Sequence, residues 1–137
     1  MNGFEPEYFR KVKFSEAQVR AFLKNAFRDL DIASKDAFPE VRFMFAYQAL
    51  VKAGIAYLAK SGVKARAVPG HHLKTLDKLG ELLKDPDVST LGNAMRMKRN
   101  EDLYGDGGFI SEKEADEYLE FVRSVLSKVK KALGHGL

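Results

Sequence analysis

Apolar residues recur every three to four positions along almost the whole chain, which is the spacing of one face of an α-helix. We find no segment that alternates between apolar and polar residues and is flanked by hairpin turns, as a half-buried strand would be. The sequence therefore predicts an all-α fold. Four to five helices joined by short loops indicate an up-and-down antiparallel bundle.

Residues typical of helix ends divide the first half of this pattern into two predicted helices. Ser15 and Gln18 have the spacing of a capping box, which opens a first helix. Pro39 suits the first turn of a second helix, and Gly62 suits its end. Because this second helix is apolar around most of its circumference, we expect it to be central and mostly buried.

The second half of the pattern predicts three more helices. A leucine stripe after the basic loop of residues 63–70 marks a third helix, which Asp85-Pro86-Asp87 should stop. Ser89 is placed to cap a fourth helix that ends near Tyr104. Ser111 begins a second capping-box pattern, and therefore a final helix.

Length and composition limit the classes of protein that remain. The chain has 137 residues, 45% of them hydrophobic, which fits one domain: an extension over residues 1–13 and a bundle over residues 14–134. The absence of cysteine excludes disulfides, thiolate nucleophiles and cysteine-based metal sites. No membrane span or signal peptide is apparent, so we expect a cytoplasmic protein. The net charge of +4 permits a phosphate-bearing partner but does not require one.

The fourth predicted helix carries a polar face. Positions three, four, seven and eight residues after Arg96 share its side of the helix, and they hold Arg99, Asn100, Leu103 and Tyr104. Two guanidiniums, a carboxamide and a phenol in this arrangement can bind a phosphate. The alternative is a structural network that satisfies the end of a helix or ties two helices of the bundle together.

His71 and His72 stand at the start of the third predicted helix. Adjacent positions diverge by about 100° on a helix, so the pair should not reach one metal ion. We therefore expect no metal and no cofactor. Either histidine can cap the helix or pair with a carboxylate, and either can act as a general base if the third and fourth helices bring it to the arginine face.

Three short motifs, taken in order, resemble the HEPN family of helical domains. They are Ala46-Tyr47-Gln48-Ala49-Leu50-Val51-Lys52-Ala53, then Pro69-Gly70-His71-His72, then Arg96-x-x-Arg99-Asn100-x-x-x-Tyr104-Gly105. The resemblance covers roughly residues 14–133. It implies a homodimer in which the arginine-containing helices face each other across a cleft. Pairing of two copies would also bury Tyr104 and the Phe109-Ile110 turn. Many members cleave RNA without metal, and others accompany a minimal nucleotidyltransferase.

The chain departs from the family at one position of its motif. Active ribonucleases of the family carry a histidine about four to six residues after the arginine, whereas Tyr104 stands there in this sequence. A phenol, with a pKa near 10, transfers protons poorly at neutral pH. We therefore expect nucleotide or RNA binding through Arg96, Arg99, His71 and His72, in one half of a toxin–antitoxin or nucleotidyltransferase pair.

Two other functions stay open at this stage. The first is a metal-independent endoribonuclease toxin in which Arg99, Asn100 and Tyr104 are catalytic, with His72 as an alternative source of the proton transfer. The second is a non-catalytic structural or interaction bundle, in which the same arginines only hold helices together.

Overall fold

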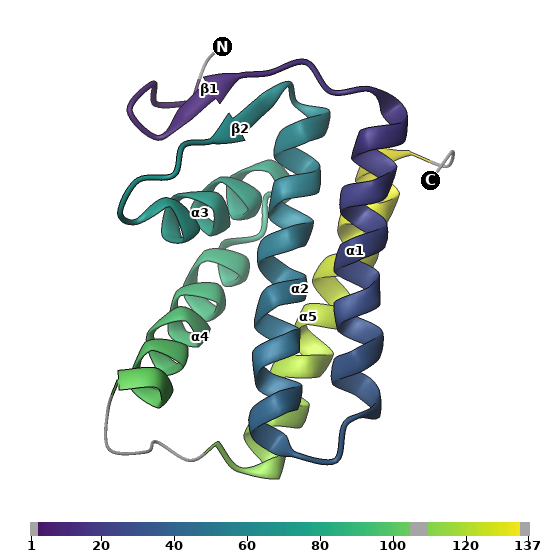
Figure 1. The fold of residues 1–137 in the computed structure, drawn as a ribbon, viewed down its shortest axis with the longest axis vertical. Coiled ribbons are helices and arrows are strands. Elements are labelled where there is room, and N and C mark those ends of the chain that lie inside the picture. The colour runs from purple at the N-terminus through teal and green to yellow at the C-terminus, as the bar shows by residue number, and fades with distance from the viewer. Residues whose placement is uncertain (1–2, 105–109, 135–137) are drawn as a thin grey trace.

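The computed structural model describes residues 3–104 and 110–134, without the side chains of residues 101–104. This part of the chain is mostly helical, which confirms the predicted helical class (Figure 1). Its five helices are α1 (Glu16–Lys35), α2 (Pro39–Lys60), α3 (His71–Leu83), α4 (Pro86–Tyr104) and α5 (Glu112–Leu133).

Three long helices form the main body of the molecule. α2 packs against both α1 and α5, and the three run side by side in Figure 1. The side chains of Phe43 and Leu50, both on α2, are completely buried. The prediction of a central, mostly buried second helix is therefore confirmed, and its burial follows from its apolar circumference.

The predicted helix ends are largely confirmed. Ser15 and Gln18 bond reciprocally, with Ser15 N–H donating to the Gln18 side chain at 2.8 Å and Gln18 N–H donating to Ser15 Oγ at 3.1 Å. Pro39 is the first residue of α2. Ser111 Oγ accepts from Glu114 N–H at 3.0 Å at the start of α5. Local sequence thus determines where these helices begin.

The prediction that Ser89 caps the fourth helix is wrong. α4 begins at Pro86, and the Asp85 carboxylate accepts from Asp87 N–H at 3.1 Å. Proline is tolerated in a first turn because its missing N–H would have no helical partner there. The Ser89 hydroxyl instead donates to the Asp77 carboxylate on α3. The residues that stop α3 therefore also start α4.

Besides the helices, the described part of the chain forms a short two-stranded sheet. β1 (Phe9–Lys11) pairs antiparallel with β2 (Val63–Ala65), in a register that sets Phe9 opposite Ala65. Three-residue strands are too short to produce a recognisable alternation, so the pattern of apolar residues did not indicate them. Phe9 is only 2% exposed, and it packs with Leu58 and Val63. β1 belongs to the predicted extension over residues 1–13, so part of this extension packs against the bundle.

α3 and α4 form a pair beside the three-helix body. α4 packs mainly against α3 and more lightly against α2. Two glycines permit the close approach of these helices. A Cβ at Gly54 would lie 2.8 Å from Thr75 Cγ2, and one at Gly92 would lie 3.2 Å from Leu76 Cδ1. The seam between α2, α3 and α4 is therefore tight, and the start of α3 is held at a fixed place.

Within residues 3–104 and 110–134, no helix combines the length and the apolar character needed to cross a bilayer.

Candidate functional site

A cleft of about 370 Å³ lies where the start of α3 meets the second half of α4. Its walls come from the loop before α3, from α3 itself, from α4, and from one side chain of α2. The lining residues are Tyr47, Ala67, Val68, Pro69, Gly70, His71, His72, Leu73, Arg96, Arg99 and Asn100. The fold thus brings the two histidines to the arginine face, which the sequence alone did not establish.

Each arginine in the cleft has a neighbour that limits its movement. Arg96 Nε and Nη2 both donate to Asn93 Oδ1, at 3.1 and 3.0 Å, one turn earlier on α4. The Arg99 guanidinium carbon lies 5.7 Å from the centroid of the Tyr47 ring on α2, a cation–π distance. Among side chains of residues 3–100 and 110–134, no carboxylate pairs with either guanidinium. The two positive charges are therefore held in place at the cleft wall.

The turn before α3 positions the histidines. Gly70 precedes the helix with a positive φ of 81°, a conformation that glycine adopts without strain. His71 Nδ1 lies 2.8 Å from the Val68 carbonyl oxygen, so its N–H donates to a backbone oxygen and not to a carboxylate. The His71 and His72 ring centroids are 4.3 Å apart. Although adjacent on a helix, the two rings are in contact and line the same cleft.

Charge and burial shift the pKa values of His72 and Tyr47, whose ring centroids lie 6.3 Å apart. Burial lowers the pKa of His72 below its usual value, and repulsion from His71, Arg99 and Arg96 lowers it further. His72 is therefore neutral at pH 7 and offers a nitrogen lone pair. Burial raises the pKa of Tyr47, while Arg99 and Arg96 act in the opposite direction. Tyr47 therefore keeps its proton and remains a hydrogen-bond donor.

Tyr47 is the cleft residue that the sequence analysis did not identify as functional. Its ring belongs to the core, with 1% exposure, as its place in an apolar helix suggests. Its hydroxyl, however, has no hydrogen-bond partner among the described residues. A buried hydroxyl without a partner is costly, by about 1–3 kcal/mol. The sequence did hold a signal of a functional role: Tyr47 is a tyrosine in an apolar helix where a phenylalanine would pack equally well.

Some predicted site residues cannot be placed in this cleft. The side chains of Leu103 and Tyr104 lie outside the described part of the structure, so a catalytic role for Tyr104 stays a prediction. Phe109 also lies outside the described residues. Ile110 is 3% exposed and belongs to the main core of its own chain. The expectation that Ile110 would be buried against a second copy is therefore wrong.

The described residues contain no group of three or more histidine, aspartate or glutamate side chains able to hold a metal ion.

Comparison of the chain with family models, with curated proteins and with solved structures found no match.

Proposed function

We propose that this cleft binds the phosphate groups of RNA or of a nucleotide. The observation that carries the proposal is the convergence of Arg96, Arg99, Asn100, His71 and His72 on one cleft from two different helices. Phosphate recognition needs fixed cationic forks and polar donors on a concave surface, and the cleft combines them. The resemblance to the HEPN family adds support, and it suggests a toxin–antitoxin or minimal nucleotidyltransferase partner.

The Tyr47 hydroxyl strengthens the case for an anionic ligand. This hydroxyl can donate a hydrogen bond, it has no partner among the described residues, and the ring that carries it lies 5.7 Å from the Arg99 guanidinium carbon. A phosphate oxygen within reach would accept from it and satisfy the buried donor. Neutral His72 can accept a hydrogen bond from a ribose hydroxyl on the same ligand. The cleft therefore offers donors to a phosphate and an acceptor to a sugar.

Binding of a labelled single-stranded RNA to Arg99→Ala tests the proposal. We expect its affinity to fall by about tenfold or more, because a hydrogen bond to a charged group is worth roughly 1.5–3 kcal/mol. Arg28→Ala is the matched control, since it removes the same charge from an exposed site on α1 away from the cleft. Fluorescence anisotropy at one salt concentration measures both. Equal loss in the two variants would show diffuse attraction to a basic surface and would overturn the proposal.

The same variant separates this proposal from a purely structural role. If Arg99 belonged to an essential buried polar network, its removal would cost about 3–5 kcal/mol of unfolding free energy. We expect a loss of only about 0.5–1 kcal/mol, the worth of a cation–π contact with Tyr47. Urea unfolding distinguishes the two values.

We propose metal-independent RNA cleavage as a second candidate function, and the position of His72 in the same cleft as Arg99 and Asn100 favours it. His72 would take the proton of a 2′-hydroxyl, whose oxygen attacks the phosphorus as the bond to the 5′-oxygen breaks. Arg99 would stabilise the charge on the phosphorus oxygens, and the leaving oxygen would take a proton from Tyr104. A cyclic phosphate and a free 5′-hydroxyl would result.

Incubation with RNA in the presence of a chelator tests this second function. Cleavage that persists in the wild type and disappears in Arg99→Ala would support it. Intact RNA, or equal cleavage in the variant, would reject it.

We also propose a symmetric homodimer with the α4 face near the two-fold axis. Leu91 and Met97 on α4 are 36% and 52% exposed, so this helix also presents apolar side chains at its surface. Two facing copies would double the positive charge of the groove. Light scattering at micromolar concentration measures the mass in solution, and a monomer would contradict the proposal.

A further inference from the structure

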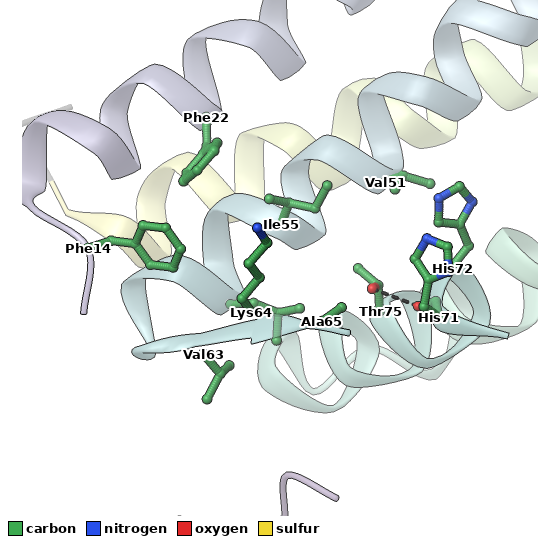
Figure 2. A pocket seen from close by; sticks show the side chains of 11 residues that line it. Phe14, Phe22, Val51, Ile55, Val63, Lys64, Ala65, His71, His72 and Thr75 are labelled. Carbon is green, nitrogen blue, oxygen red and sulfur yellow. Dashed lines mark hydrogen bonds between the residues drawn. The ribbon is translucent and has the colours of Figure 1, made fainter. Parts of the chain in front are cut away.

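A second pocket, of about 310 Å³, lies next to the cleft and shares two residues with it. Its wall is formed by α1, by the segment that leads into α1, and by α2, β2 and α3. Figure 2 shows Phe14 and Phe22 at one end, the His71 and His72 rings at the other, and Ile55 with Lys64 between them. Its volume is near the lower end of the roughly 300–1,000 Å³ that small-molecule sites occupy.

The pocket is apolar over most of its surface. Phe14 and Phe22 meet edge to face, with ring centroids 5.4 Å apart, and aliphatic side chains of α2 and β2 complete the wall. The Thr75 hydroxyl is already engaged, because it donates to the His71 carbonyl oxygen at 2.8 Å (Figure 2). Lys64 and the histidine rings are the polar groups that remain. A nucleobase would leave several edge atoms without partners there, whereas a hydrocarbon or plain aryl group would not.

The histidine end of this pocket lies within the field of the arginines. Both His71 and His72 line both hollows, and the charges of Arg99 and Arg96 act on the His72 ring. An anionic group at this end therefore meets positive charge on the cleft side, while an attached apolar group faces the aromatic end. The two hollows together match a ligand with one apolar part and one anionic part.

We propose that this pocket binds a small organic phosphate monoester with a short alkyl or aryl group, and that this ligand competes with RNA for the histidine wall. The proposal rests on the phosphate-binding role of the neighbouring cleft. The apolar group would fill the space between Phe22 and Ile55, and the phosphate would occupy the end formed by His71 and His72. A bound phosphate there would repel an RNA phosphate from the cleft, so the small ligand would regulate RNA binding.

Calorimetric titration with 1-naphthyl phosphate tests the proposal on the full chain. We expect this probe to bind at least about tenfold more tightly than inorganic phosphate and than 1-naphthol, because only the probe uses both hollows. It should also displace labelled RNA. Affinity no better than that of inorganic phosphate, or no better than that of 1-naphthol, would overturn the proposal.

Ile55→Trp is the matched variant. Ile55 is 38% exposed at the pocket, so a larger ring narrows the pocket without entering the core. Phe38→Trp is the control, because Phe38 is 66% exposed and lies outside the pocket. We expect Ile55→Trp to weaken 1-naphthyl phosphate binding by about tenfold and to leave RNA affinity unchanged, whereas Phe38→Trp should change neither.

Ala65→Leu provides an independent check, since it fills the pocket from β2 and should have the same selective effect. Unchanged probe affinity in a folded pocket variant would overturn the proposal. RNA binding without probe binding in the wild type would refute this inference alone. Probe binding without RNA binding would refute the proposed RNA function and leave the small-ligand site standing.

Discussion

The three-helix body of α1, α2 and α5 and the α3–α4 pair differ in how they use polar residues. In the body, buried side chains such as Phe43 and Leu126 are apolar and sit in one continuous core. In the pair, half-buried histidines and arginines converge on a cleft. Burial of apolar surface stabilises both regions, because Leu76, Leu79 and Met95 of the pair belong to the same core, but only the pair also gathers arginine and histidine side chains at a cleft. The body therefore contributes mainly stability, whereas the pair also carries the candidate ligand chemistry.

Tyr47 and Gly54 connect the two regions, because both lie on α2 and both face the pair. The Tyr47 ring supports Arg99, and the missing side chain at Gly54 leaves room for Thr75 of α3. The site is therefore positioned by the body even though its charged groups lie outside it. This arrangement predicts that changes in the body will alter stability most, and that changes at the seam will alter both stability and site.

Phe43→Ala should give the largest effect on stability. The ring is completely buried on α2 and meets Tyr118 of α5 edge to face at 5.6 Å between centroids. Its removal leaves a cavity, and we expect a loss of about 3–5 kcal/mol of unfolding free energy in urea. Phe38→Ala, at a 66% exposed position, is the control and should change stability by less than about 0.5 kcal/mol. Equal effects would contradict the assignment of stability to the body.

The sequence predicted the body better than the pair, and the reason is physical. Ser15, Pro39 and Ser111 act through neighbours within a few residues, so local pattern is enough to place these helix starts. At the start of α4 two residues have the character of a cap: the Asp85 carboxylate accepts from Asp87 N–H, whereas the Ser89 hydroxyl contacts Asp77 of α3. Tertiary contacts of that kind are not encoded in the local pattern.

The site was predictable in part for the same reason. Arg96, Arg99 and Asn100 share a helix face by spacing alone, so sequence identifies them as a group. The approach of His72 and Tyr47 to this group depends on how α2, α3 and α4 pack, and no spacing rule gives that. The β1–β2 pairing joins segments more than fifty residues apart, so no local spacing rule indicated it either.

Gly54→Ala should have an intermediate effect and should test the seam. The new Cβ would lie 2.8 Å from Thr75 Cγ2, and a β-branched side chain cannot easily move away. Overpacking costs about 1–3 kcal/mol, while alanine favours a helix over glycine by about 1 kcal/mol. We expect a net loss of about 1 kcal/mol in urea unfolding. Because Thr75 bonds the His71 carbonyl, the histidine ring resonances in an NMR spectrum should shift as well.

Gly92→Ala is the matched control for the seam. Its Cβ would meet the methyl ends of Leu76 and Leu50 at 3.2 and 3.5 Å, and these longer side chains can adjust. We expect little loss of stability and no shift of the histidine resonances. A larger loss at Gly92 than at Gly54 would show that α4, and not α3, is the tightly fitted helix.

The pH dependence of stability should give the smallest effect and bears on the site alone. The pKa of His72 in the folded protein is lowered from the ordinary value of 6.5 by burial and by nearby positive charge. As the pH falls below 6.5, the unfolded chain takes up this proton before the folded chain does. Stability is therefore full above that pH and declines as the pH falls toward the folded pKa. The urea midpoint of the wild type should fall between pH 7.5 and 5.5 by more than that of His72→Gln, which lacks the titrating ring.

RNA affinity should change in the opposite direction over the same pH range. Protonation of His72 removes the acceptor for a sugar hydroxyl but adds a positively charged donor for a phosphate beside Arg99. Because the charged contact is the stronger of the two, binding should strengthen as stability declines. Anisotropy titrations at the two pH values, with His72→Gln as the comparison, measure this change. Parallel pH profiles in wild type and variant, for both stability and binding, would show that His72 does not act in the site, and the positive charge of the cleft would then come from Arg96 and Arg99 of α4.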